Sequence, residues 1–267
     1  MLTRLNRSAR DWIASWWRIA RFALLIFSLA LTPSTYSRAN CTAIARQLVL
    51  AASANLLWFT VLASLISVVL IRIVVITALS YGLSKYALEM VVRVLVLELI
   101  PLTAALFVAL RSTLPDGVEF AEQRAYHARQ ARRSGKIVPP QDIPTLQHAF
   151  VPRVLAGLFS VWLLAAVSCV TALVLAYITI YGFTPWALSG YTRTVGQIFN
   201  PAVAMILLLK VFFFSLAVAL IPLASSYEDG SAAARLRLSP GHALLDMVRL
   251  FSVILIVEIA SLMGNYY

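Results

Sequence analysis

Residues 88–110 read LEMVVRVLVLELIPLTAALFVAL, and this stretch decides the fold class. It is apolar over most of its 23 positions and lacks the strict alternation of a half-buried strand. A helix of this length crosses about 30 Å of hydrocarbon. Because lipid offers the backbone no hydrogen-bond partners, the segment must satisfy its own N–H and C=O groups. The stretch therefore predicts a transmembrane α-helix.

Four further apolar stretches have the same character, at residues 51–81, 154–181, 201–225 and 247–263. The whole chain is 61% hydrophobic and 12% charged, far from the composition of water-soluble domains. We therefore expect an all-α integral membrane protein with five transmembrane helices. No internal repeat separates the stretches, so residues 1–267 are expected to form one domain.

A sixth apolar stretch, residues 11–31, differs from the five spans in its amphipathic start. Trp16 stands close to Arg18 and Arg21, and this pairing favours the headgroup region. The pattern predicts an interfacial helix on the inner leaflet, ended by Pro33. A signal peptide is the alternative, although no convincing small-x-small cleavage site follows.

The chain has a net charge of +11, and its basic residues are divided unequally between the two expected sides of the membrane. With the N-terminus inside, only Lys85 and Arg193 fall in outer loops, whereas seventeen basic residues fall in inner segments. This asymmetry predicts an N-in, C-out topology and favours contact with anionic lipid over binding of nucleic acid. The inner basic residues are Arg4, Arg7, Arg10, Arg18, Arg21, Arg38, Arg46, Arg111, Arg124, Arg129, Arg132, Arg133, Lys136, Arg153, Arg235, Arg237 and Arg249.

Two polar connections are long enough to carry a function of their own. Residues 111–147 contain a helix-forming stretch at 119–133, which predicts a short cytoplasmic helix; a solvated connecting loop is the alternative. Residues 182–200 mix aromatic and turn residues. An aromatic belt at the membrane surface is the simpler interpretation of this outer segment, and docking of a partner is the other.

Charged residues within the spans are the candidate functional groups, because a charge in lipid needs a partner or water. Glu98 precedes Pro101 by three residues, and the proline exposes a carbonyl near that carboxylate. Lys210 lies at a similar depth in the fourth span, so the two side chains are placed to pair, either as a structural ion pair or in contact with a ligand. Arg93 is expected to snorkel, and Glu258 to face the helix bundle or to be protonated.

Other site classes find little support in the sequence. It contains no phosphate-binding loop of the form GxxxxGK[ST], no GxSxG elbow and no HExxH pair. Cys41 and Cys169 are expected at different depths, and the three histidines lack ligand spacing. No metal and no cofactor are predicted, and ATP hydrolysis is expected on another chain.

Two segments resemble the MlaE family of ABC transporter permeases. Residues 97–111, LELIPLTAALFVALR, are similar to the family segment RELGPVxxALLxAGR, and residues 151–158, VPRVLAGL, are similar to its VPRVLAGL. ARQL at 45–48, LLKVFFF at 208–214 and a carboxylate in the last span follow the family order, so the resemblance extends over nearly the whole chain.

The resemblance implies a fold, a function and partners. The fold would be an MlaE-type permease, with residues 1–47 as an interfacial and elbow region and 48–267 as a five-span bundle with a cytoplasmic loop at 111–150. The function would be movement of phospholipid between inner and outer membranes. The chain would be a homodimer in the bacterial inner membrane, bound to a cytoplasmic ABC ATPase and to a periplasmic MCE-domain protein.

The resemblance also implies site residues. Leu70, Tyr81 and Leu99 fall where the family lines its lipid cavity. Glu98 and Lys210 would be the few polar groups of this largely apolar cavity. Separately, three residues correspond to the loop that couples the permease to its ATPase: Glu122, Gln123 and Asp142.

Departures from the family pattern leave two alternatives to a transporting permease. Leu97 replaces the family's arginine, and the small-residue run after the second span is replaced by residues 110–117, LRSTLPDG. A non-transporting scaffold subunit of such a complex is the first alternative. An intramembrane enzyme using Glu98 or Glu258 is the second, although it lacks a second catalytic group at matching depth.

Overall fold

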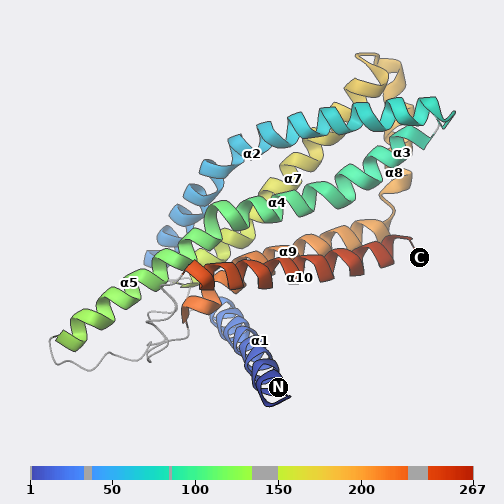
Figure 1. Ribbon diagram of the computed structural model, residues 1–267. Coiled ribbons are helices and arrows are strands. Elements are labelled where there is room, and N and C mark those ends of the chain that lie inside the picture. Colours follow the sequence, from blue (N-terminus) through green and yellow to red (C-terminus); the bar gives the residue numbers. More distant parts are fainter. Residues whose placement is uncertain (1, 33–37, 84–85, 134–149, 228–239, 267) are drawn as a thin grey trace. The chain divides into compact units, whose positions relative to one another are not determined.

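The computed structural model describes residues 2–32, 38–83, 86–133, 150–227 and 240–266, and every regular element in them is helical (Figure 1). The elements are α1 (Leu2–Leu31), α2 (Arg38–Ser80), α3 (Ala87–Val91), η3 (Val92–Leu99), α4 (Ile100–Val108), η4 (Ala109–Thr113), α5 (Leu114–Arg133), α7 (Val151–Tyr181), η6 (Pro185–Ala187), α8 (Leu188–Ile198), α9 (Pro201–Tyr227) and α10 (Pro240–Tyr266).

Within this described part, five helical stretches are long and apolar enough to span a membrane. They confirm the five spans expected from hydropathy, so this is a multi-pass membrane protein. The observed helices run further than the apolar stretches, because polar residues at their ends also adopt the helical conformation. The five candidates are Ile44–Ser80, Ala87–Glu119, Val151–Tyr181, Pro201–Ala224 and Leu244–Asn265.

Three expectations about the connecting segments need correction. Helix α1 begins at Leu2 rather than at residue 11. The helix expected at 119–133 begins at Leu114 and continues directly from the second span. The segment 182–200, expected on the outer side, contains η6 and the eleven-residue helix α8, where the sequence indicated only turns and aromatics.

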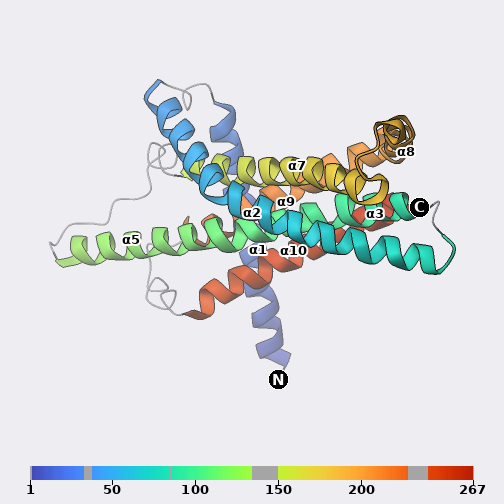
Figure 2. The same cartoon turned by 90° about the horizontal axis from the view of Figure 1, so that it is seen from above.

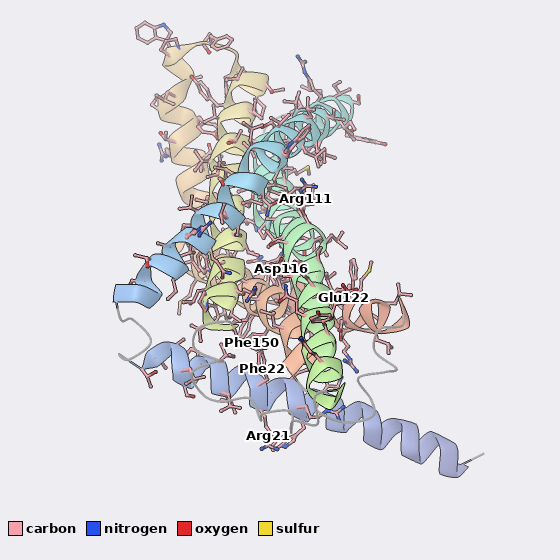
Figure 3. The ribbon with its side chains drawn as sticks, turned by 90° about the vertical axis from the view of Figure 1, so that its left-hand side faces the viewer. Arg21, Phe22, Arg111, Asp116, Glu122 and Phe150 are labelled. Carbon is pink, nitrogen blue, oxygen red and sulfur yellow. The ribbon has the colours of Figure 1, made fainter. Side chains whose placement is uncertain are left out.

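The chain divides into two compact units. The first comprises Met1–Val49, Ala109–Gly157 and Ala217–Phe251. In this unit, Phe22 of α1 packs edge-to-face on Phe150, with the ring centroids 5.7 Å apart (Figure 3). Arg21, its neighbour in the chain, is exposed, as expected for a helix with one apolar and one polar face.

A second contact in the first unit brings two backbones together. A Cβ on Gly117 of α5 would lie 2.9 Å from the carbonyl oxygen of Pro222 in α9, so only glycine fits there. Gly157 of α7 has a similar but looser environment beside Thr113 and Ala219, both at 3.3 Å. Small residues thus let α5, α7 and α9 approach closely in this unit.

The second unit comprises Leu50–Val108, Leu158–Leu216 and Ser252–Tyr267. Its apolar core is built from α3 and η3 together with parts of α2, α7, α8 and α9. Figures 1 and 2 both show α8 beside α3, in agreement with the contacts between these helices. Tyr191 of α8 is buried there, and its hydroxyl donates to the Leu173 carbonyl of α7 at 2.8 Å.

Candidate functional site

Pro101 determines the local backbone around Glu98. Its ring nitrogen carries no hydrogen, so it cannot bond Leu97 O, its usual acceptor in an α-helix, or Val96 O, its acceptor in the wider π register. The eight residues Val92–Leu99 form the π-helix η3, and the N–H of Ile100 bonds five residues back. The proline thus leaves carbonyl oxygens of the second span available to side chains from other helices.

Both of these carbonyls are occupied in the second unit. Lys210 Nζ, from α9, donates to Leu97 O at 3.2 Å, and the Cys169 thiol, from α7, donates to Val96 O at 3.7 Å. Because an unpartnered carbonyl in lipid is costly, these contacts give the Lys210 ammonium and the Cys169 thiol a structural role within the spans.

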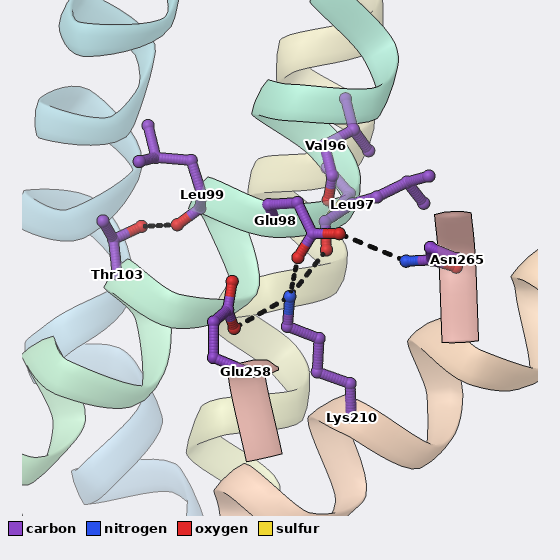
Figure 4. A network of polar contacts seen from close by, with 9 residues as sticks. Val96, Leu97, Glu98, Leu99, Thr103, Lys210, Glu258 and Asn265 are labelled. Atoms are coloured by element: carbon purple, nitrogen blue, oxygen red, sulfur yellow. Dashed lines mark hydrogen bonds and ion pairs between the residues drawn. The ribbon is translucent and has the colours of Figure 1, made fainter. Parts of the chain in front are cut away.

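Lys210 is the centre of a polar cluster (Figure 4). Its side chain is 1% exposed and is ion-paired to Glu98 of η3 and to Glu258 of α10, the latter with 2.9 Å between Nζ and Oε2. The ammonium group therefore contacts three acceptors, counting the Leu97 carbonyl. The Phe214 ring lies 5.8 Å from Nζ and adds a favourable cation–π contact.

Glu98 is held from two sides. One carboxylate oxygen is ion-paired with the Lys210 ammonium, and the other accepts a hydrogen bond of 3.1 Å from Asn265 Nδ2 of α10. Lys210, Glu98, Glu258 and Asn265, named here the Lys210 cluster, thus join α9, η3 and α10. All four belong to the second unit.

The α10 members of the cluster share one helix face. Ile254, Glu258, Ser261 and Asn265 follow one another at spacings of four, three and four residues, which places them on one stripe. Ile254 and Ser261 are buried, whereas Ile259 and Leu262, off this stripe, are exposed. The packed face of the last span is therefore largely polar in this unit.

The pairing of Glu98 with Lys210, predicted from their depth, is present. Glu258 faces the bundle, one of the two outcomes expected for it. Asn265 was missed, although the four-three-four spacing on the last span is a signal that could have found it. Arg93, expected to snorkel, is 32% exposed and paired with Glu89 one turn earlier, at 3.0 Å.

The expected lipid-lining residues lie in the second unit but differ in environment. Leu70 and Leu99 are half-buried against its apolar core. Tyr81, after the end of α2, is 77% exposed. Their role as a lipid-binding surface stays a prediction.

The expected coupling residues lie apart from the Lys210 cluster in sequence and belong to the first unit. Glu122 and Gln123 are exposed on α5 (Glu122 is labelled in Figure 3), and Gln123 Nε2 donates to Glu119 Oε1 at 3.1 Å. Asp142 lies outside the described residues. Among the residues that the structure describes, no three His, Cys, Asp or Glu side chains gather as a metal site would require.

Comparison with known proteins gives one positive result. The sequence model of the family described as Permease MlaE matches residues 44–263. This range covers most of the chain, includes four of the candidate spans completely and reaches to within two residues of the end of the fifth. No curated protein matches the chain at a significant level.

Proposed function

Because the chain belongs to the MlaE permease family, we propose that it is the membrane subunit of an ABC-type complex that moves phospholipid between the inner and outer membranes. Membership in a permease family means a transport subunit, and an ABC permease implies a separate ATPase. The family match over residues 44–263 is the observation that carries the proposal.

The proposed orientation is N-in and C-out in the bacterial inner membrane, since the excess of basic residues on one side favours the cytoplasm. The ATPase then docks on the inner side and an MCE-domain protein on the periplasmic side. Two copies of the chain form a homodimer whose interface encloses the lipid. The family's organisation supports these partners.

The proposed lipid path lies along Leu70, Leu99 and Tyr81, next to Glu98 and Lys210. Half-buried leucines provide the apolar wall that acyl chains need, and few polar groups interrupt it. Glu98 and Lys210 stabilise this wall because their ion pair joins two helices. They do not present a charge to the lipid, since the Lys210 side chain is only 1% exposed. Tyr81 offers an amphipathic ring where a headgroup would pass.

The proposed coupling surface is the exposed face of α5 at Glu122 and Gln123, followed by Asp142 in the connection after it. Since α5 continues directly from the second span, a movement of the ATPase would be transmitted along one continuous helix to η3. This continuity supports a mechanical connection without an intervening loop.

The test is ATP-dependent phospholipid transfer by the purified complex in proteoliposomes. We expect the tagged chain to co-purify with an ABC ATPase, an MCE-domain protein and phospholipid. Leu70→Asn should reduce transfer, because it places an amide in the apolar wall. Val69→Asn is the matched control, since this neighbouring side chain is 57% exposed on another face of α2.

A non-transporting scaffold subunit is the second candidate. Residues 110–117, LRSTLPDG, replace the small residues that the family carries after its second span, and this favours an altered coupling region. A complex that assembles with the ATPase, yet transfers lipid equally well with the Leu70→Asn variant, would favour the scaffold.

A further inference from the structure

The Lys210 cluster contains an imbalance of charge. One ammonium group lies between two carboxyl groups, each on a side chain that is 13% exposed. With every group ionised, the cluster would carry one net negative charge inside spans that cross hydrocarbon. A buried charge without a counter-charge is strongly disfavoured, so the cluster needs one more positive charge or one more proton.

The two carboxyl groups are not equivalent. Glu98 receives the Lys210 ammonium on one oxygen and the Asn265 amide on the other, so two donors stabilise its charge. Glu258 has the ammonium 2.9 Å from Oε2, but this buried oxygen receives no aligned hydrogen bond from the described residues. The environment therefore favours an ionised Glu98 and a neutral Glu258.

The surroundings of Glu258 supply acceptors rather than further cations. Among the described residues, the charged side chains that act on Glu258 are Lys210 from α9 and Glu98 from η3. The Cys169 thiol of α7 is bonded to the neighbouring Val96 carbonyl. On α10 itself, Ser261 Oγ and Asn265 Oδ1 are buried and find no hydrogen-bond partner among the described residues. Ser261 is 7% exposed.

We infer that the Lys210 cluster is a proton-binding site: it holds one proton on Glu258 and is electrically neutral as long as that proton is bound. The proton adds to the Glu258 carboxylate to give a carboxylic acid, and its loss returns one negative charge to the cluster. This inference goes beyond the proposed transport and does not depend on it, because it rests only on the charges and contacts of the second unit.

Infrared spectroscopy of the purified chain in nanodiscs tests the inference, because it separates the C=O stretch of a carboxylic acid from the bands of a carboxylate. We expect an acid band near neutral pH that disappears in Glu258→Gln. It should also disappear in Glu98→Gln, because the remaining glutamate then pairs alone with Lys210. Lys210→Met should strengthen the band, since both carboxyl groups would then be protonated.

Thermal unfolding of the same samples assigns the proton to one residue. Glutamine imitates a protonated glutamate, so Glu258→Gln should melt close to the unmodified chain, whereas Glu98→Gln should melt clearly lower. Raising the pH until the acid band vanishes should lower the melting temperature of the unmodified chain but not that of Glu258→Gln.

The control variant is Glu89→Gln, which removes a carboxylate 39% exposed and paired with Arg93 and should leave the acid band unchanged. Absence of an acid band from the unmodified chain near neutral pH would overturn the inference, whether or not any variant folds. An acid band that persists in Glu258→Gln would overturn it too. The inference would also be overturned if Glu98→Gln melted close to the unmodified chain and Glu258→Gln melted clearly lower, because the proton would then lie on Glu98.

Discussion

Lys210 illustrates how a single buried cation can organise several helices. Its ammonium group makes two contacts with η3, an ion pair with the Glu98 carboxylate and a hydrogen bond to the Leu97 carbonyl. It also forms an ion pair with Glu258 of α10. Breaking a buried ion pair by removing one partner costs about 3–5 kcal/mol, because the other charge stays behind unpaired. The contribution of an exposed pair is much smaller, and this difference gives the first prediction.

Glu98→Ala should destabilise the protein by up to about 3–5 kcal/mol. It removes the better-bonded of the two carboxylates on Lys210, takes the acceptor away from Asn265, and requires Glu258 to give up its proton to balance the ammonium. Arg93→Ala is the comparison, since it removes a half-exposed pair with Glu89 worth about 0.3–0.5 kcal/mol. Thermal unfolding in one detergent, with expression levels matched, measures the difference. Equal losses in the two variants would show that the Lys210 cluster contributes little to stability.

Tyr191 gives a prediction about alkaline pH. Burial, with a smaller effect of Tyr181, raises the pKa of Tyr191 to about 12 from its ordinary value of 10.0. A folded-state pKa above the unfolded value stabilises the protein fully below pH 10, and this contribution is lost as the pH rises towards about 12. Tyr191→Phe should therefore flatten the fall in stability across this range.

Chemical unfolding of both proteins at several alkaline pH values measures that slope. Tyr191→Phe should also cost about 1 kcal/mol at neutral pH, because the hydroxyl no longer donates to Leu173 O. An unchanged alkaline slope in Tyr191→Phe would show that another group controls it.

Sequence reasoning found the Lys210 cluster in part. Glu98 and Lys210 were recognisable because a charge inside an apolar stretch is conspicuous, and because counting residues from the membrane surface gave their depth. Asn265 was missed, since an amide near the end of a span looks like an interfacial residue, although its spacing from Glu258 and Ser261 places it on the same helix face. The packing of α10 shows which acceptor the amide reaches, namely Glu98.

At the level of elements, the glycines occupy two kinds of environment: some lie where two helices cross closely, and others lie on an open helix surface. Gly117 of α5 lies against the backbone of Pro222, whereas an added Cβ on Gly190 of α8 would meet nothing within 4 Å. Gly117→Ala should therefore destabilise the protein by about 1–3 kcal/mol through overpacking. Gly190→Ala should be neutral or stabilise by up to about 1 kcal/mol, as expected for alanine in an open helical position.

Thermal unfolding of the two glycine variants side by side tests this contrast. The pair is well matched, because each substitution adds the same methyl group within a helix. A neutral Gly117→Ala would mean that α5 and the Pro222 turn of α9 can separate at little cost, contrary to the tight crossing in the first unit.

The elements themselves were predictable where hydropathy alone determines them. All five spans were located correctly, because lipid requires a continuous apolar helix. Helix α8 was missed since Gly190, Gly196 and the preceding Pro185 suggest turns, and its stability comes from the packing of Tyr191 against Tyr177 and Tyr181. The start of α5 was misplaced because Pro115 and Gly117 usually interrupt helices, yet here they lie within one.

On the scale of the whole molecule, the sidedness of the chain is open to direct measurement. Arg193→Cys in α8 should react with a membrane-impermeant maleimide on intact spheroplasts, because α8 follows the third span on the proposed outer side. Glu122→Cys on α5 should react only after the membrane is opened. Both substitutions are made in a Cys41→Ser background, and the opposite pattern would reverse the proposed topology.

The π-helical turn η3 also affects how related chains are compared. A π turn holds more residues than an α turn, so Val92–Leu99 behaves like an α-helix that has gained a residue. Each residue advances an α-helix by about 100°. A homologue one residue shorter in this stretch would therefore keep its hydropathy profile and still present a different side chain to the lysine. An alignment that places its gap elsewhere would equate residues that occupy different faces of the helix.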